Sequence, residues 1–139
     1  MKKINSLFVV IVFSTFISCQ ATKNKTESMN KIEKVQIKSV DFSIMTFLSV
    51  ECDNFEEYFK EYRQISITDT MVIDELLNQM VELEPIDSTY SKSVDTRAKI
   101  ELFSKNDTNT ICVGNLTLCM NNYIYKTPEE LIDFIEKIE

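Results

Sequence analysis

The sequence has no histidine, no tryptophan and a single glycine, Gly114. Without an imidazole there are no Ser-His or Cys-His nucleophile pairs, no histidine-ligated zinc and no histidine acid–base chemistry. With one glycine, a glycine-rich phosphate-binding loop is excluded. The chemistry left to the chain uses carboxylates, hydroxyls, lysine, arginine and thiols, and none of these forms a catalytic or metal-binding motif. We therefore expect a protein that is not an enzyme and binds no metal or cofactor.

Positive charge is also scarce. The chain has 15 basic and 22 acidic residues. Lys2 and Lys3 are the only charged residues among the first nineteen, so the rest carries 13 basic against 22 acidic residues, a net charge of −9. An acidic surface argues against nucleic acid and anionic lipid headgroups as partners. It is compatible with a basic protein partner.

The first nineteen residues have the pattern of an export signal. Lys2 and Lys3 precede an apolar run that is unbroken from Leu7 to Phe13 and stops at small residues before Cys19. The run is too short to span a bilayer, because a spanning helix needs about 20 apolar residues. The pattern alone is compatible with an ordinary cleaved signal peptide.

Phe16-Ile17-Ser18-Cys19 resembles the lipobox of bacterial lipoproteins, although Phe16 stands where the family usually has leucine. The resemblance covers residues 1–19 only. It implies that this segment is a signal peptide and that Cys19 carries the lipid after cleavage. Acyl chains on one cysteine hold a protein at a membrane, since each buried methylene contributes about 0.8 kcal/mol.

A polar segment, residues 20–32, follows Cys19 and predicts a flexible tether. Gln20 is not aspartate, which by the sorting rule of the resembled family favours the outer membrane. No acidic run directly follows the cysteine, so we expect the protein to face the periplasm.

Residues 33–139 predict one small α+β domain, with an antiparallel sheet of five to six strands and two to three helices packed on it. Strand composition marks 34–50 as one or two strands, and 96–104, 110–113, 116–120 and 123–126 as four more. Apolar spacing predicts helices over 53–63 and from Thr68 or Asp69 to about 83, with 64–67 as an extended link between them. A last helix should start near Pro128, with Thr127 as its cap. Two hairpin turns are expected, at Gly114-Asn115 and at Asn121-Asn122.

Three cysteines remain besides Cys19. Cys52, Cys112 and Cys119 cannot all pair, and an oxidising periplasm allows one disulfide among them. A turn at Gly114-Asn115 would make Cys112 and Cys119 diagonal neighbours, whereas a four-residue loop over 114–117 would set them opposite each other. Cys52 could reach either one. Buried free thiols are the alternative that we favour.

Four tyrosines are candidates for a protein interface: Tyr58, Tyr62, Tyr123 and Tyr125. Tyrosine is enriched in interfaces. However, Phe55, Tyr58, Phe59 and Tyr62 have helical spacing that is more typical of a core, and tyrosines on a small sheet also cover its edge.

Asp87-Ser88-Thr89 resembles the three-residue O-glycosylation signal of some bacteria, which makes Ser88 a candidate acceptor in an expected loop. The sequence as a whole predicts a lipid-anchored protein-binding module, with an inhibitor or immunity protein as one concrete form. The alternative is a binder of a small envelope ligand such as a lipid or glycan, which requires a concave apolar pocket.

Overall fold

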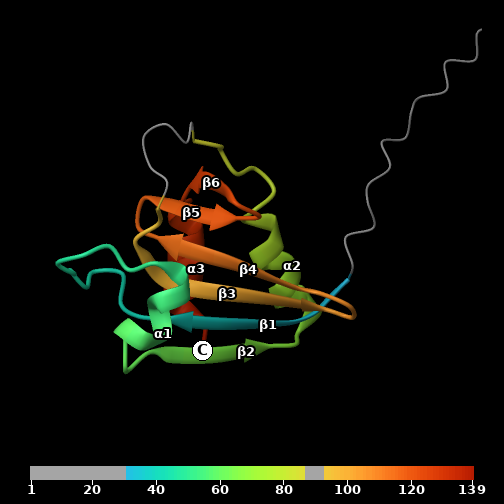
Figure 1. Cartoon of the computed structure of the whole chain (residues 1–139). Helices are drawn as coiled ribbons and strands as arrows, with labels where there is room; N and C mark the ends of the chain where they lie inside the picture. The colour runs from blue at the N-terminus through green and yellow to red at the C-terminus, as the bar shows by residue number, and fades with distance from the viewer. Residues whose placement is uncertain (1–30, 87–92) are drawn as a thin grey trace, which may run out of the picture.

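The computed structural model describes residues 31–86 and 93–139, which form one six-stranded antiparallel sheet with helices (Figure 1). The strands are β1 (Ile32–Ser39), β2 (Arg63–Ile67), β3 (Thr96–Ser104), β4 (Thr108–Gly114), β5 (Thr117–Met120) and β6 (Tyr123–Lys126), in the spatial order β2-β1-β3-β4-β5-β6. The helices are the 3₁₀ turn η1 (Cys52–Asn54), α1 (Phe55–Tyr58), α2 (Thr70–Asn78) and α3 (Glu129–Lys137). The predicted α+β architecture is confirmed.

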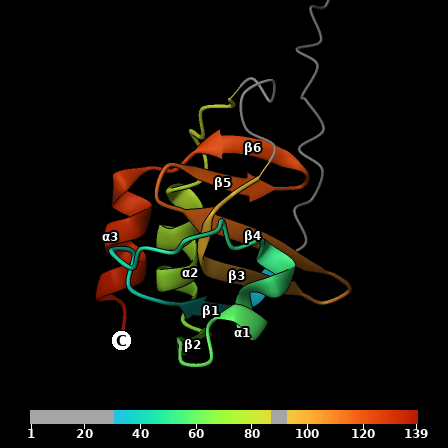
Figure 2. The ribbon, with the colours of Figure 1, turned by 60° about the vertical axis from the view of Figure 1, so that its left-hand side comes forward.

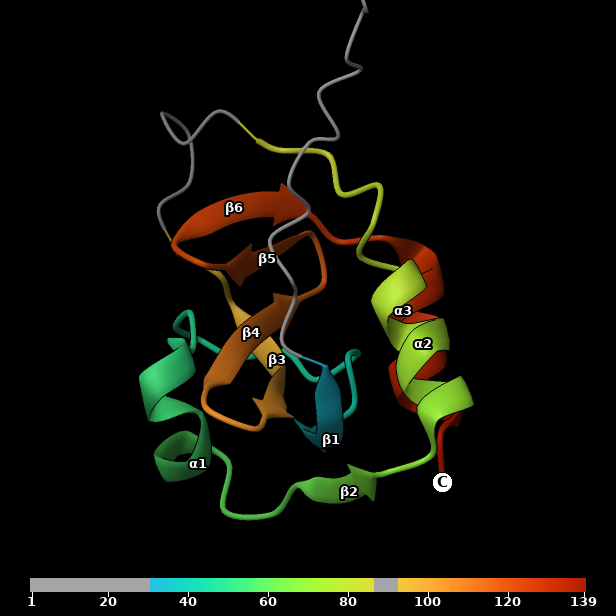
Figure 3. The ribbon, with the colours of Figure 1, turned by 90° about the vertical axis from the view of Figure 1, so that its right-hand side faces the viewer.

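The helices lie on the two faces of the sheet. Figures 2 and 3 show α2 and α3 together on one face, while α1 lies on the other. The main core is between the sheet and the α2–α3 pair, because alternate strand residues point to the same face. Its buried side chains include Val35, Ile37, Ala98, Ile100, Leu102, Ile111, Val113 and Leu118 from the strands, and Ile73, Leu76, Leu131 and Ile135 from the helices.

The predicted strand over 34–50 is wrong beyond Ser39, because residues 40–51 leave the sheet and form a loop. The helix predicted over 53–63 is shorter and consists of η1 and α1. It ends because Phe59 has an extended backbone, with φ −93° and ψ 104°. The predicted link after it is the edge strand β2, paired with β1. Helix α2 ends at Asn78, five residues before the predicted end.

Gly114 does not form a turn, contrary to the prediction. A β-carbon at this position would lie 2.5 Å from the carbonyl oxygen of Asp95, so glycine is needed for a close approach of backbone. The register places Val113 opposite Leu118 and Cys112 opposite Cys119, as in the alternative with a loop over 114–117.

The second hairpin turn is confirmed, since both asparagines have positive φ, 52° at Asn121 and 65° at Asn122. The start of α3 differs from the prediction. Pro128 is the N-cap residue and Glu129 begins the helix. Thr127 does not cap it, because its hydroxyl donates instead to the carbonyl of Gly114 at 2.9 Å.

Candidate functional site

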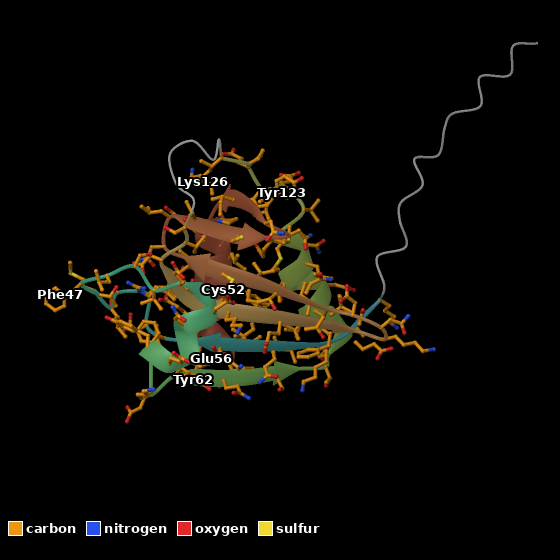
Figure 4. All side chains as sticks on the ribbon, viewed as in Figure 1. Phe47, Cys52, Glu56, Tyr62, Tyr123 and Lys126 are labelled. Carbon is orange, nitrogen blue, oxygen red and sulfur yellow. A yellow bond between two sulfur atoms is a disulfide. The ribbon has the colours of Figure 1, made fainter. Side chains whose placement is uncertain are left out.

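The loop of residues 41–50, called the apolar loop below, is the most prominent surface feature of the described domain. Met45, Phe47 and Leu48 are 96%, 105% and 75% exposed. Figure 4 shows Phe47 at the tip of this loop, pointing away from the rest of the molecule. Residues 42–50 contain no charged side chain. Three large apolar side chains in one short exposed segment are typical of an interaction site.

The two ends of the apolar loop are anchored in hydrophobic clusters. Phe42 belongs to the main core, and Val50 packs with Phe55 and Phe59 in a second cluster. This second cluster lies beside α1, and Tyr62 is partly buried against it. The anchors explain why only the segment between them is exposed.

Arg97 holds the apolar loop in place through hydrogen bonds. Its side chain is almost fully buried, and it donates from Nε to the carbonyl of Ile44 at 3.1 Å and from a terminal nitrogen to Oγ1 of Thr46 at 3.0 Å. Asp95 neutralises the guanidinium through two hydrogen bonds of 2.7 and 2.8 Å. The planar fork of arginine suits such a bidentate pair.

Further hydrogen bonds hold the loop at both ends. Oδ1 of Asp95 accepts from the backbone N–H of Val50 at 2.9 Å, and the side-chain amide of Asn115 donates to the carbonyl of Phe42 at 2.9 Å. Hydrogen bonds from Ser43 hold the pKa of Asp41 below its ordinary value, so this carboxylate stays charged at the start of the loop. The apolar loop is therefore held in one conformation, with exposed side chains at its tip.

A hollow of about 780 Å³ adjoins the base of the apolar loop, lined in part by Asp41, Ile44, Tyr62 and Arg63. Arg63 donates to the carbonyls of Glu136 and Ile138 at 3.1 and 3.0 Å and also to that of Ile135, at the end of α3. These bonds satisfy carbonyls that a helix end leaves without partners. Glu61 and Glu136 also line the hollow, so three of its four charged lining residues are acidic.

Glu56 links α1 to the face of the sheet on which α1 lies. Its Oε1 accepts from Nζ of Lys38 at 2.8 Å and from Nζ of Lys99 at 3.3 Å. Partial burial works to raise the pKa of Glu56, but the hydrogen bonds from the two lysines outweigh it and hold that pKa below its ordinary value. The same hydrogen bond raises the pKa of Lys38. This cluster has a structural role, since all its charges have partners.

A disulfide joins Cys52 to Cys112, with the two Cα atoms 5.7 Å apart. The structure therefore contains one of the pairings that the sequence left open, and the interpretation that we favoured, free thiols at both positions, is wrong. Cys119 is a half-buried free thiol. The disulfide ties η1, which begins two residues after the apolar loop, to β4.

The structure does not bring the four candidate tyrosines together. Tyr58 is exposed on α1 and Tyr62 lies just before β2, whereas Tyr123 and Tyr125 are on β6 at the opposite edge of the sheet. Tyr125 packs against the main core. Tyr62 is the one that lines the hollow beside the apolar loop. Cys19 and Ser88 lie outside the described residues.

A second concave site lies beside α2, with a volume of about 590 Å³. Its apolar lining includes Ile73, Leu77, Met80, Leu102 and Met120, and its polar lining includes Lys31 and Asp74. Small-molecule sites usually have volumes of about 300–1,000 Å³, so this groove has the size and polarity of a ligand site.

Sequence reasoning missed the apolar loop. One signal was present: Ile44-Met45 and Phe47-Leu48 are adjacent apolar pairs, which break the period of two that a half-buried strand requires. Within residues 31–86 and 93–139, no group of acidic or cysteine side chains is arranged to hold a metal ion. In the same part of the chain, no helix has the length and apolar character needed to cross a membrane.

Comparison with family models, with curated proteins and with solved structures finds no match for this chain.

Proposed function

We propose that this chain is a non-catalytic protein-binding module of the bacterial cell envelope and that the apolar loop is its docking surface. The exposure of Phe47 on a braced loop carries this proposal. Lipid on Cys19 would hold the protein at the membrane, as the lipobox resemblance implies. Gln20 favours the outer membrane, and the lack of an acidic run after Cys19 favours the periplasmic face.

The energetics of the loop favour a binding role. Full burial of a Phe, Leu or Met side chain contributes about 1.5–3 kcal/mol. The three exposed side chains at the tip thus offer roughly 5–9 kcal/mol of gross binding free energy. The hydrogen bonds from Arg97 fix the loop before binding, which reduces the ordering cost that flexible loops incur on association.

The charges around the loop define the partner that we propose. Asp41, Glu51 and Asp53 flank the apolar segment, while the guanidinium of Arg97 is already neutralised by Asp95. A partner with an apolar pocket and a basic rim is complementary to this surface. An inhibitor or immunity protein that blocks a basic protein is the concrete form of this function.

Site-specific photocrosslinking tests the proposal. A benzophenone amino acid replaces Phe47 in the full chain in its own bacterium, and adducts are identified by mass spectrometry. Met71 at the start of α2 is the matched control, because it is also exposed and apolar. We expect one protein adduct at position 47 that is absent at position 71. Equal adducts at both positions, or adducts with lipid alone, would overturn the docking role.

The groove beside α2 supports the second candidate function, a binder of a small apolar envelope ligand such as a lipid. Its apolar lining and its volume of about 590 Å³ are the observations in favour. Native mass spectrometry of the protein purified from its own envelope tests this function. A bound small molecule that is lost on Leu77→Glu substitution would support it, and an unliganded mass would argue against it.

A further inference from the structure

Three cysteines meet on one face of the sheet. Cys112 on β4 lies directly opposite Cys119 on β5, and directly opposite residues in antiparallel strands point to the same face. Cys52 reaches Cys112 on this face from η1 and forms the disulfide with it. Cys112 thus has a second sulfur neighbour beside the one to which it is bonded.

The register makes Cys119 a geometrically competent partner for Cys112. Directly opposite residues of an antiparallel pair have Cα atoms about 4.5–5.5 Å apart. Disulfides bridge Cα atoms that are about 4.4–6.8 Å apart. Either pairing, Cys52 with Cys112 or Cys112 with Cys119, can therefore form without a change of strand register.

We propose that Cys119 exchanges with the disulfide and thereby regulates the apolar loop. The thiolate of Cys119 attacks Sγ of Cys112, so that a Cys112–Cys119 bond forms and the Cys52–Cys112 bond breaks. The electron pair of the broken bond leaves on Sγ of Cys52, which takes up a proton equivalent to the one that Cys119 lost. The step is an isomerisation with no net oxidation.

The exchange changes the support of the docking surface. Cys52 lies two residues after the end of the apolar loop and precedes Phe55 of the second cluster, so its bond to β4 constrains this end of the loop covalently. After exchange, this end is held by the packing of Val50 and by its hydrogen bond to Asp95. A less constrained loop binds more weakly. This regulation rests on the proposed docking function.

Disulfide mapping of the full-length protein tests the exchange without a partner. Trypsin leaves Cys52 on one peptide, 39–60, and both other cysteines on another, 106–126. The protein is incubated at pH 8 without added thiol, quenched in acid, labelled with N-ethylmaleimide and digested. The resting isomer gives two linked peptides with one label on Cys119. The exchanged isomer gives separate peptides, with the label on Cys52 and an internal disulfide in 106–126.

We expect the exchanged peptides to accumulate with time in the wild type and to be absent from Cys119→Ser. Linked peptides alone at every time point would overturn the proposal. The Cys52→Ser variant provides a second test. Oxidised glutathione should form a Cys112–Cys119 disulfide in this variant, and glutathione adducts without that disulfide would also overturn the proposal. Neither test uses a partner. A positive mapping with failed photocrosslinking at position 47 would instead refute the docking function and leave the exchange standing.

Discussion

The disulfide between Cys52 and Cys112 should carry a large part of the stability of the domain. Its two cysteines are 60 residues apart in sequence. In the chain-entropy treatment, closing a loop of this length in the unfolded chain stabilises the fold by about 4 kcal/mol. Domains of this size are stable by only about 5–15 kcal/mol. We therefore expect reduction to remove between a quarter and most of the free energy of unfolding.

Urea unfolding followed by far-ultraviolet circular dichroism measures this loss. The best background is Cys119→Ser, because this variant retains only the Cys52–Cys112 pair and cannot exchange. Unfolding is compared with and without a phosphine reductant, and the slope of free energy against urea should also rise on reduction, since the unfolded chain expands. A loss below about 1 kcal/mol would refute the reasoning that this bond constrains the unfolded chain. The double variant Cys52→Ser/Cys119→Ser is the control and should match the reduced protein with or without reductant.

Three further predictions concern single side chains. Arg97→Met removes the two hydrogen bonds to the apolar loop and should lower the free energy of unfolding in urea by about 2–3 kcal/mol. Chymotrypsin should also cleave the loop faster in this variant, and unchanged cleavage would argue against the role of Arg97 in holding the loop. Gly114→Ala places a methyl group against a backbone carbonyl and should cost about 1–3 kcal/mol, whereas Leu116→Ala in the exposed turn should cost under 0.5 kcal/mol. The pKa of Glu56 is lower in the folded protein than its ordinary value of 4.5. Glu56 therefore stabilises the fold at pH values above 4.5, and this contribution is lost as the pH falls through the folded pKa. Between pH 5 and 3 the free energy of unfolding should therefore fall less steeply in Glu56→Gln than in the wild type, and equal slopes would contradict the ion-pair assignment.

Several elements of the fold follow from local sequence. The alternation of Ala98, Ile100 and Leu102 with charged residues predicts β3 with the bounds that the structure has. The apolar stripe of α3 and the paired asparagines of the last hairpin are also local signals. These features are predictable because they depend only on residues within one helical turn or one hairpin of each other.

The candidate site depends on contacts between distant parts of the chain, which explains why it was not predicted. Arg97 fixes Ile44 and Thr46, which precede it by 53 and 51 residues. Cys52 pairs across a sequence separation of 60. A chain segment rich in β-branched and aromatic residues has strand composition, and the loop forms only because Phe42 and Val50 find separate hydrophobic clusters. Periodicity within the segment carries no information on those clusters.

The course of β1 sets the direction in which the domain presents its loop. The strand begins at Ile32 and ends at Ser39, two residues before the apolar loop. Figure 1 shows these two ends of β1 at opposite sides of the domain. Eight residues of strand span about 26 Å. If lipid on Cys19 holds the chain at a bilayer and residues 20–32 act as the proposed tether, the domain can orient so that Phe47 is its part most distant from that surface. The length of that segment then sets the radius within which a partner can be reached.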